Sequence, residues 1–479
     1  MTRSLPLLCL ALALALAAPA AAKTSKKDVQ NAFKTGDKDK VLAVLKEVAG
    51  SLDRDLVKAV VENAKRLRSI GVYEDLVQAL STASGDALDE LIKEYKKVKK
   101  DGALRFLVLD SLGGAKDERA EALLVEAATK DKDEPIRVLA IRQLGKRATK
   151  SAVEALIPFL GELEKAKTES ERLIREVNGA LQNLTGGDLS VAEDWRNWWE
   201  QNKDKFTPKQ EEGKTAERGN VLDRMAKERP ADLKSITRIK DGELIVVRGN
   251  DKVEDVLDAL KLKHKRIKRD ELEKLDLDPQ SQILLLNCPG REAFSDAGVQ
   301  KVRDFVVKGG YVFCSDWELG KTLAKAFPEA CQFLKEAPKG DVKDVTIVPF
   351  PESASHPLMR DVFPLNTFET GGFAWKLEGR SHLAKQTPQI VPLVSCPAIK
   401  DQGTTMVAFC FAYADLKGAA RPVTGGDMKK LKQPPGQVLW VSSHFKLQKD
   451  PKSDGFALQQ LLLNFIVEKQ EQRRKFAAR

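Results

Sequence analysis

The chain has 479 residues, of which 42% are hydrophobic and 31% charged, a balance typical of globular proteins and unlike that of disordered chains. Its 80 basic and 70 acidic side chains leave a net charge of only +10, and the two signs are interleaved, as in residues 130–134 (KDKDE). Interleaved charge is typical of solvated helix surfaces, so we expect no nucleic-acid partner.

The first 22 residues have the three parts of a secretory signal peptide. Arg3 gives a positively charged start, an apolar run covers residues 5–16, and small residues at 17–22 end in Ala20-x-Ala22. The apolar run is shorter than the ~20 residues that a membrane-spanning helix needs. We therefore expect cleavage near Ala22, export to the periplasm or the cell exterior, and no membrane-spanning segment in the mature chain.

Residues 23–206 carry apolar side chains at helical spacing and contain an internal repeat. Arg105, Leu112 and Gly113 recur 32 residues later as Arg137, Leu144 and Gly145. Two-helix repeats of this length stack into solenoids, because one helix pair cannot bury its apolar face alone. The segment 134–145 (EPIRVLAIRQLG) resembles a HEAT repeat, and the resemblance covers about 103–184. It implies an α-solenoid that binds a protein partner and carries no chemistry of its own.

Residues 207–240 are rich in charge and predict a linker, with a short helix at 221–227 as an alternative for part of it. After this segment the pattern changes. Short apolar strands alternate with helices, which predicts a doubly wound, mainly parallel sheet. The expected strands are 244–247, 283–286, 311–314, 345–348, 406–411 and 438–442. The expected helices are 253–260, 295–308, 317–327 and 456–468, followed by a basic tail at 469–479.

The order of motifs in this half resembles a known fold. An apolar strand leads into Asn-Cys-Pro-Gly (287–290), then Gly-Gly-Tyr-Val-Phe (309–313) and Ser-Asp-Trp (315–317), and later comes GQVLWVSSHF (436–445). This order is similar to that of the class I glutamine amidotransferase-like α/β domains of bacterial exported proteins, over about 241–468. The resemblance implies a flavodoxin-like, amidotransferase-like fold and points to Cys314 and His444 as the catalytic candidates.

The surroundings of these two candidates depart from the family's chemistry. A nucleophile at a tight strand-to-helix turn usually has glycine two residues to either side, and here those positions hold Val312 and Asp316. The family's orienting carboxylate, two residues after the histidine, is replaced by Lys446. We therefore expect a degenerate, non-catalytic domain. In an alternative placement Ser315 or Asp316 occupies the turn and Cys314 packs within the strand. The rival hypothesis is a cysteine-dependent hydrolase or amidotransferase-like enzyme with Cys314, His444 and an unidentified acid.

Asp316, Trp317 and His444 are the candidate ligand-binding residues, because open α/β sheets bind ligands just beyond the carboxyl ends of their strands. The competing interpretation is that Asp316 only caps the next helix. A small molecule or a glycan is the kind of ligand considered. No residues show the spacing of a metal site or a cofactor-binding loop, so we expect neither. The five cysteines beyond the leader, none in a CxxC pair, are expected to be buried thiols, with one disulfide as the alternative; they are Cys288, Cys314, Cys331, Cys396 and Cys410.

Overall fold

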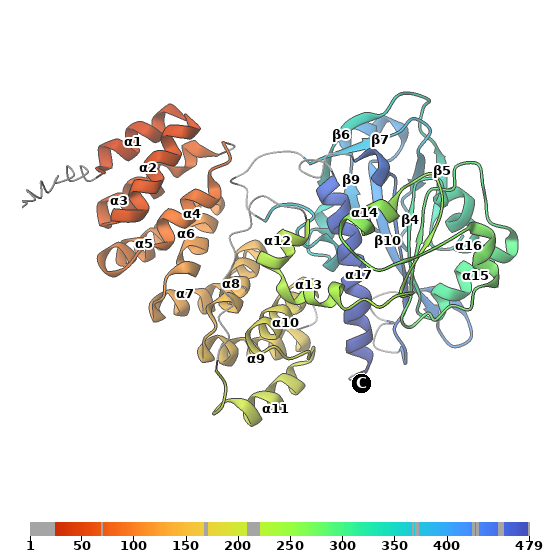
Figure 1. The fold of residues 1–479 in the computed structure, drawn as a ribbon, viewed down its shortest axis with the longest axis horizontal. Helices are drawn as coiled ribbons and strands as arrows, with labels where there is room; N and C mark the ends of the chain where they lie inside the picture. The colour runs from red at the N-terminus through yellow and green to blue at the C-terminus, as the bar shows by residue number, and fades with distance from the viewer. Residues whose placement is uncertain are drawn as a thin grey trace, which may run out of the picture.

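A computed structural model describes residues 24–68, 70–166, 171–207, 221–365, 368, 373–423, 427, 431–448 and 455–477. The expected signal peptide, residues 1–22, lies outside the described residues. Within them, a helical half is followed by a half built around one large sheet (Figure 1). No helix in the described ranges is long and apolar enough to cross a membrane.

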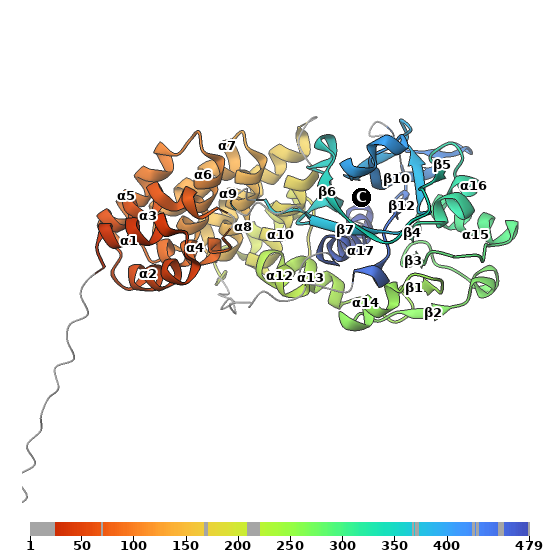
Figure 2. The same ribbon diagram turned by 90° about the horizontal axis from the view of Figure 1, so that it is seen from above.

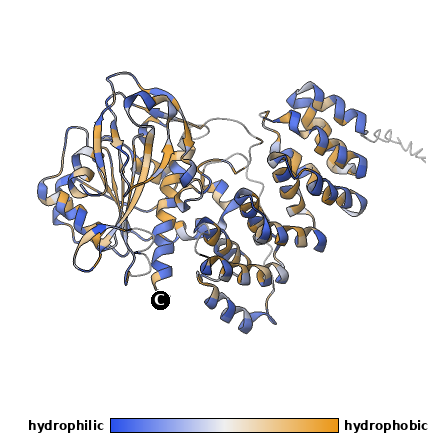
Figure 3. Cartoon of the chain, turned by 180° about the vertical axis from the view of Figure 1, so that it is seen from behind, coloured by the Kyte–Doolittle hydropathy of each residue, from blue (hydrophilic) through white to orange (hydrophobic). Residues whose placement is uncertain are grey.

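The helical half is a solenoid with one continuous apolar core. Its helices are α1 (Lys26–Thr35), α2 (Lys38–Ser51), α3 (Arg54–Ala64), α4 (Tyr73–Ser81), α5 (Gly85–Lys97), α6 (Gly102–Gly114), α7 (Glu118–Lys130), α8 (Glu134–Arg147), α9 (Lys150–Lys165), α10 (Glu171–Thr185) and α11 (Ala192–Asn202). Side-chain caps begin several of them; the Asp101 carboxylate, for example, accepts a hydrogen bond from Leu104 N. Apolar residues line the surfaces where the helices meet, and polar residues face outward (Figure 3).

The repeated glycines of the solenoid are explained by close helix packing. Gly145 in α8 lies so near α10 that a Cβ atom would be 3.0 Å from Ala180 Cβ. A Cβ atom at Gly113 in α6 would overlap the side chain of Gln143 in α8. The 32-residue recurrence thus marks the positions where successive helices of one layer approach most closely.

Part of the expected linker is folded. Residues 221–237 form α12 (Val221–Glu228) and α13 (Pro230–Thr237), separated by one residue. α13 contacts α10 on one side and α17 on the other, and α12 also contacts α17, so the two helices lie between the solenoid and the α/β half (Figure 2).

The large sheet is mixed, so the expectation of a mainly parallel sheet holds only for one side of it. Its order is β2-β1-β3-β4-β12-β10-β9-β6-β7, with β11 paired to β10. The first five strands are parallel, whereas β10, β9, β6 and β7 pair antiparallel. The strands are β1 (Leu244–Val247), β2 (Lys265–Ile267), β3 (Ile283–Leu286), β4 (Tyr311–Ser315), β6 (Lys343–Pro349), β7 (Phe373–Leu377), β9 (Val391–Ser395), β10 (Met406–Asp415), β11 (Ala420–Pro422) and β12 (Gly436–Val441). A separate pair consists of β5 (Gln332–Glu336) and β8 (His382–Lys385).

Helices cover both faces of the parallel strands, which explains why β1, β3, β4 and β12 are almost entirely apolar. Alternate side chains point to opposite faces. Tyr311 and Phe313 of β4 share a core with α17 (Gly455–Ala477), and Val312 and Cys314 share the other core with α15 (Asp296–Val307).

The closing helix α17 continues through most of the segment expected as a basic tail. Basic side chains of this segment form hydrogen bonds and an ion pair that could not be predicted from the sequence pattern. Lys469 Nζ donates to Pro279 O at 2.7 Å and Gly309 O at 2.8 Å, and Arg474 pairs with Asp188 of the solenoid side at 2.6 Å. The described part of the segment expected as a basic tail is therefore helical to Ala477 and paired with neighbouring segments.

Candidate functional site: a buried polar centre at the strand ends

Asp316 occupies the sharp turn directly after β4. Its φ angle is +43°, a conformation that costs a residue with a Cβ atom of the order of 1–3 kcal/mol and persists only where surrounding contacts enforce it. Here Asp316 N donates to Val441 O at 2.7 Å, and Trp440 Nε1 donates to Asp316 O at 2.9 Å. The turn residue is therefore Asp316, one of the two placements considered from the sequence.

The Asp316 side chain points toward other strands. Its Oδ1 accepts a hydrogen bond from His382 N of β8 at 2.7 Å, and its Oδ2 lies 3.5 Å from His444 Nε2. No backbone N–H of the following helical turn appears among its described partners, so the carboxylate does not act as a helix cap. Burial raises the pKa of Asp316 to about 7, although the neighbouring His444 works in the opposite direction.

Cys314 lies inside β4 and is fully buried in the apolar core on the α15 side. Its Sγ donates a weak hydrogen bond to Leu439 O at 3.7 Å. Burial, followed by the nearby Glu318 carboxylate, raises the pKa of the thiol well above its ordinary value, which disfavours the reactive thiolate. Within the described residues, no contact joins Cys314 to His444.

His444 follows β12 and lies between two carboxylates. Its Nε2 faces Asp316, and its Nδ1 is 3.3 Å from Glu378 Oε1. The side chain is 2% exposed, and neither ring nitrogen makes a well-directed hydrogen bond in the described structure. Burial lowers the pKa of His444, but the contacts with Cys288 and Glu378 outweigh it, so the pKa lies well above its usual range.

Glu378, directly after β7, places a carboxylate beside His444. The sequence has Lys446 at the position where such a carboxylate was expected. Contact with His444 lowers the pKa of Glu378 to about 2, and Lys446 Nζ lies 3.3 Å from the same Oε1. Lys446 therefore pairs with the orienting carboxylate instead of replacing it. Sequence reasoning missed Glu378 because it follows a strand that was not predicted.

Cys288, directly beyond Asn287 at the end of β3, is the second residue that sequence reasoning missed. Its Sγ, one carboxylate oxygen of Asp316 and one ring nitrogen of His444 all lie within 4.8 Å of one another, and all three residues are buried. Cys288 N donates to Ser315 Oγ at 3.0 Å, which ties the two neighbouring strand ends together.

Asp251, in the loop after β1, completes the centre. Its Oδ1 accepts hydrogen bonds from Phe445 N at 2.8 Å and Lys446 N at 3.3 Å, whereas its buried Oδ2 has no partner in the described structure. One signal links this residue to Cys288, Asp316 and His444: each follows a different parallel strand. The rule that ligands bind at the carboxyl ends of such strands could have grouped all four.

Trp317 is placed beside this centre but has other contacts. Its Nε1 donates to Arg380 O at 2.8 Å, and its ring stacks on His382 with centroids 5.7 Å apart. Of the sequence candidates, the structure thus brings Asp316 and His444 together and leaves Cys314 and Trp317 with separate surroundings. The five cysteines within the described residues are all free and buried.

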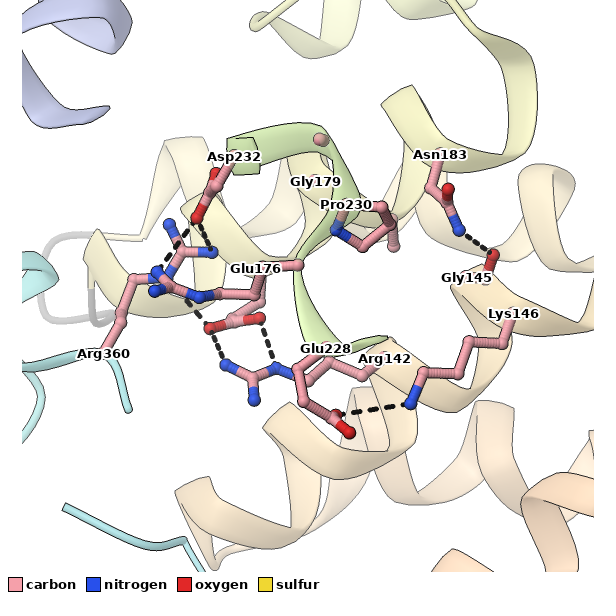
Figure 4. Close-up of a pocket in the computed structure, with 13 residues that line it drawn as sticks. Arg142, Gly145, Lys146, Glu176, Gly179, Asn183, Glu228, Pro230, Asp232 and Arg360 are labelled. Carbon is pink, nitrogen blue, oxygen red and sulfur yellow. Dashed lines mark hydrogen bonds and ion pairs between the residues drawn. The ribbon is translucent and has the colours of Figure 1, made fainter. Parts of the chain in front are cut away.

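A second polar cluster joins the two halves of the molecule (Figure 4). Arg142 of α8 forms two 2.8 Å hydrogen bonds with Glu176 of α10 and contacts Asp361 of the α/β half at 2.9 Å. Arg360 contacts Glu176 at 3.0 Å, and Arg229, between α12 and α13, contacts Asp361 at the same distance. The cavity beside them holds only about 20 Å³ and its charged groups are paired, so this cluster is a structural joint.

Comparison with known proteins gives a family for part of the solenoid. One solved structure that aligns is the exo-β-1,4-mannosidase Op5Man5 from Opitutaceae bacterium strain TAV5, at 7% identity over 94% of this chain and 93% of that one. Its TM-score is 0.26, which does not indicate a common fold. No curated protein matches the chain. Residues 88–172 match the family model of HEAT repeats, which identifies the centre of the solenoid as a HEAT-repeat region.

Proposed function

We propose that the protein is an exported, non-catalytic scaffold whose HEAT repeats bind a partner protein. Its α/β domain is a degenerate relative of the class I amidotransferase-like, flavodoxin-like fold that holds a ligand at the strand ends. HEAT repeats form extended surfaces that commonly mediate protein interactions. Export rests on the signal-peptide pattern of residues 1–22.

The observation that carries the non-catalytic part is the identity of the turn residue. In a thiol enzyme of this kind the sulfur lies on the sharp turn, where it is exposed to substrate. Here the turn holds the Asp316 carboxylate, and the sulfur of Cys314 points into an apolar core. Asp316 and His444 are themselves 1% and 2% exposed, so the centre is closed to a substrate of ordinary size.

A groove on the solenoid supports the scaffold role. It has a volume of about 400 Å³ between α5 and α7 and is lined by partly exposed Ile92 and Leu123 with charged Asp89, Lys96 and Arg119 around them. A small apolar floor with charges of both signs around it suits a polar peptide segment that carries one or two apolar anchors. We therefore place the partner-binding surface of this proposal in that groove.

Capture of partners by the purified chain tests the proposal. We expect Leu123→Arg to abolish capture of the specific partner, because a long cation would fill the groove. Leu42→Arg, which changes a partly buried leucine on α2 outside the groove, is the matched control and should leave capture unchanged. Equal capture by both variants and the unmodified chain would show that the groove is not the partner-binding surface.

One observation favours a second candidate, a cysteine-dependent hydrolase or transferase. The His444 imidazole lies between the Cys288 thiol and the Glu378 carboxylate. A thiol, an imidazole and a carboxylate are the residue types that such catalysis needs. In this candidate the nucleophile is Cys288, in place of the Cys314 expected from the sequence. It requires Cys288 to react with thiol reagents in the folded protein, whereas the scaffold proposal requires all thiols to be protected.

A further inference from the structure

The strand-end centre contains the three types of side chain that together bind transition metals. Cys288, Asp316 and His444 come from the ends of three different parallel strands and converge within 4.8 Å. We propose that these residues bind one divalent transition-metal ion of the zinc type. The proposal rests on the strand-end ligand site of the proposed function, whose ligand it identifies, and it is independent of partner binding by the solenoid.

The distances fit a four-coordinate ion. In a tetrahedral zinc site with Zn–N and Zn–O bonds of about 2.0 Å, the bound nitrogen and oxygen are roughly 3.3 Å apart. His444 Nε2 and Asp316 Oδ2 are 3.5 Å apart, which needs almost no movement. Sulfur and nitrogen bound to zinc are roughly 3.6 Å apart. The Cys288 sulfur lies within 4.8 Å of both other ligand atoms, so a shift of roughly 1 Å or less brings it to the third corner of the site.

The neighbouring residues orient the proposed ligand atoms of Asp316 and His444. Asp316 Oδ1 is occupied by His382 N, so Oδ2 is the oxygen that faces His444. Glu378 lies on the Nδ1 side of His444, the position at which carboxylates commonly orient a metal-binding histidine. Nε2 makes no well-directed hydrogen bond in the described structure, and the carboxylate oxygen that faces it, Asp316 Oδ2, is itself a proposed ligand.

The local charge also favours a cation. Asp316, Glu378 and Asp251 place three carboxylates around His444, and Asp251 Oδ2 is buried without a partner. Lys446 is the one lysine paired with this group in the described structure, through Glu378. When His444 binds a metal as a neutral imidazole, Lys446 alone offsets the three carboxylates, and a divalent ion supplies the missing positive charge.

The mixture of ligand atoms selects the class of metal. Magnesium and calcium prefer oxygen ligands alone, whereas thiolate and imidazole favour zinc and its neighbours in the transition series. Three protein ligands leave one coordination position for water or for a small anionic ligand. The ligands are separated by 28 and 128 residues, so no short metal-binding motif marks the site, and only their shared position after parallel strands connects them.

The test is a titration of the full metal-free chain with Co²⁺, which substitutes for zinc and shows thiolate-to-metal and tetrahedral ligand-field absorption. We expect one Co²⁺ per chain with both bands, and displacement by one equivalent of Zn²⁺. Cys288→Ser should remove the thiolate band, whereas Cys331→Ser, which changes a buried free cysteine outside the cluster, should retain it.

A milder variant guards against misfolding as the cause of any loss. Glu378→Gln changes a partly exposed side chain beside His444 and should weaken Co²⁺ binding by about 10–100-fold while both bands persist at saturation. Absence of a thiolate band in the unmodified chain at stoichiometric Co²⁺, or its persistence in Cys288→Ser, would overturn the metal site. Neither result would affect partner capture by the solenoid groove, so failure of this site is distinguishable from failure of the scaffold proposal.

Discussion

The solenoid and the α/β half bury charge in different places. The solenoid packs an apolar core from neighbouring helices, and several of its most deeply buried charges, such as Arg142 and Arg175, meet carboxylates of the other half. The α/β half buries a polar centre of its own at the ends of β3, β4 and β12. The comparison teaches that several deeply buried charges of the solenoid serve attachment to the other half, whereas the strand-end charges of the sheet domain form a candidate binding site.

The largest effect expected from this comparison concerns the joint. Arg142→Ala removes the guanidinium that pairs with the buried carboxylates of Glu176 and Asp361. We therefore expect the free energy of unfolding to fall by about 3–5 kcal/mol. Urea unfolding followed by circular dichroism measures it. Arg196→Ala, which removes an exposed ion pair with Glu193, is the control and should cost only a small fraction of that. Similar losses in both variants would contradict a buried joint.

Acid should weaken the same joint. Burial raises the pKa of Glu176, but Arg142 and Arg360 outweigh it and lower the pKa from its ordinary 4.5 to about 2. A carboxyl whose folded-state pKa is lowered stabilises the fold fully above its unfolded pKa and loses that contribution as the pH falls through the folded value. The stability difference between the unmodified chain and Glu176→Gln should therefore be largest above pH 4.5 and shrink toward pH 2. A difference that does not vary with pH would show that the carboxylate charge is not responsible.

A smaller effect tests helix packing within the solenoid. Gly145→Ala forces a Cβ atom against Ala180, and we expect it to cost about 1–3 kcal/mol. Gly179→Ala changes a helical glycine with no neighbour within 4 Å of the new atom, so it should stabilise the protein by up to about 1 kcal/mol. Thermal unfolding of the two variants should shift in opposite directions, and a shift in the same direction would contradict the close-packing role of the repeat glycine.

Much of the fold could be predicted because the determining patterns are local. The strands 244–247 and 283–286 were confirmed, since strands buried on both faces are unbroken apolar runs. The edge strand β2 was missed because its Lys265 and Arg266 are exposed. On the antiparallel side β7, β9 and β11 were missed as well, whereas β6 was expected at 345–348 although it is largely exposed.

The site was only partly predictable because it is assembled from distant segments. Asp316 and His444 were identified since each follows a recognisable strand. Glu378 was missed with its strand β7, and Cys288 was taken for a core residue because it follows the apolar run of β3. Its proximity to His444 depends on the order of strands in the sheet, which the residues of either strand alone do not specify.

The claim that the α/β half holds a closed, non-catalytic centre is tested most directly by thiol labelling of the folded protein at neutral pH. Modified cysteines would be mapped by mass spectrometry before and after unfolding in denaturant. We expect no modification of Cys288, Cys314, Cys331, Cys396 or Cys410 until the protein unfolds, since all five are buried. Rapid and selective modification of Cys288 or Cys314 in the folded state would contradict the claim and favour a thiol-dependent enzyme.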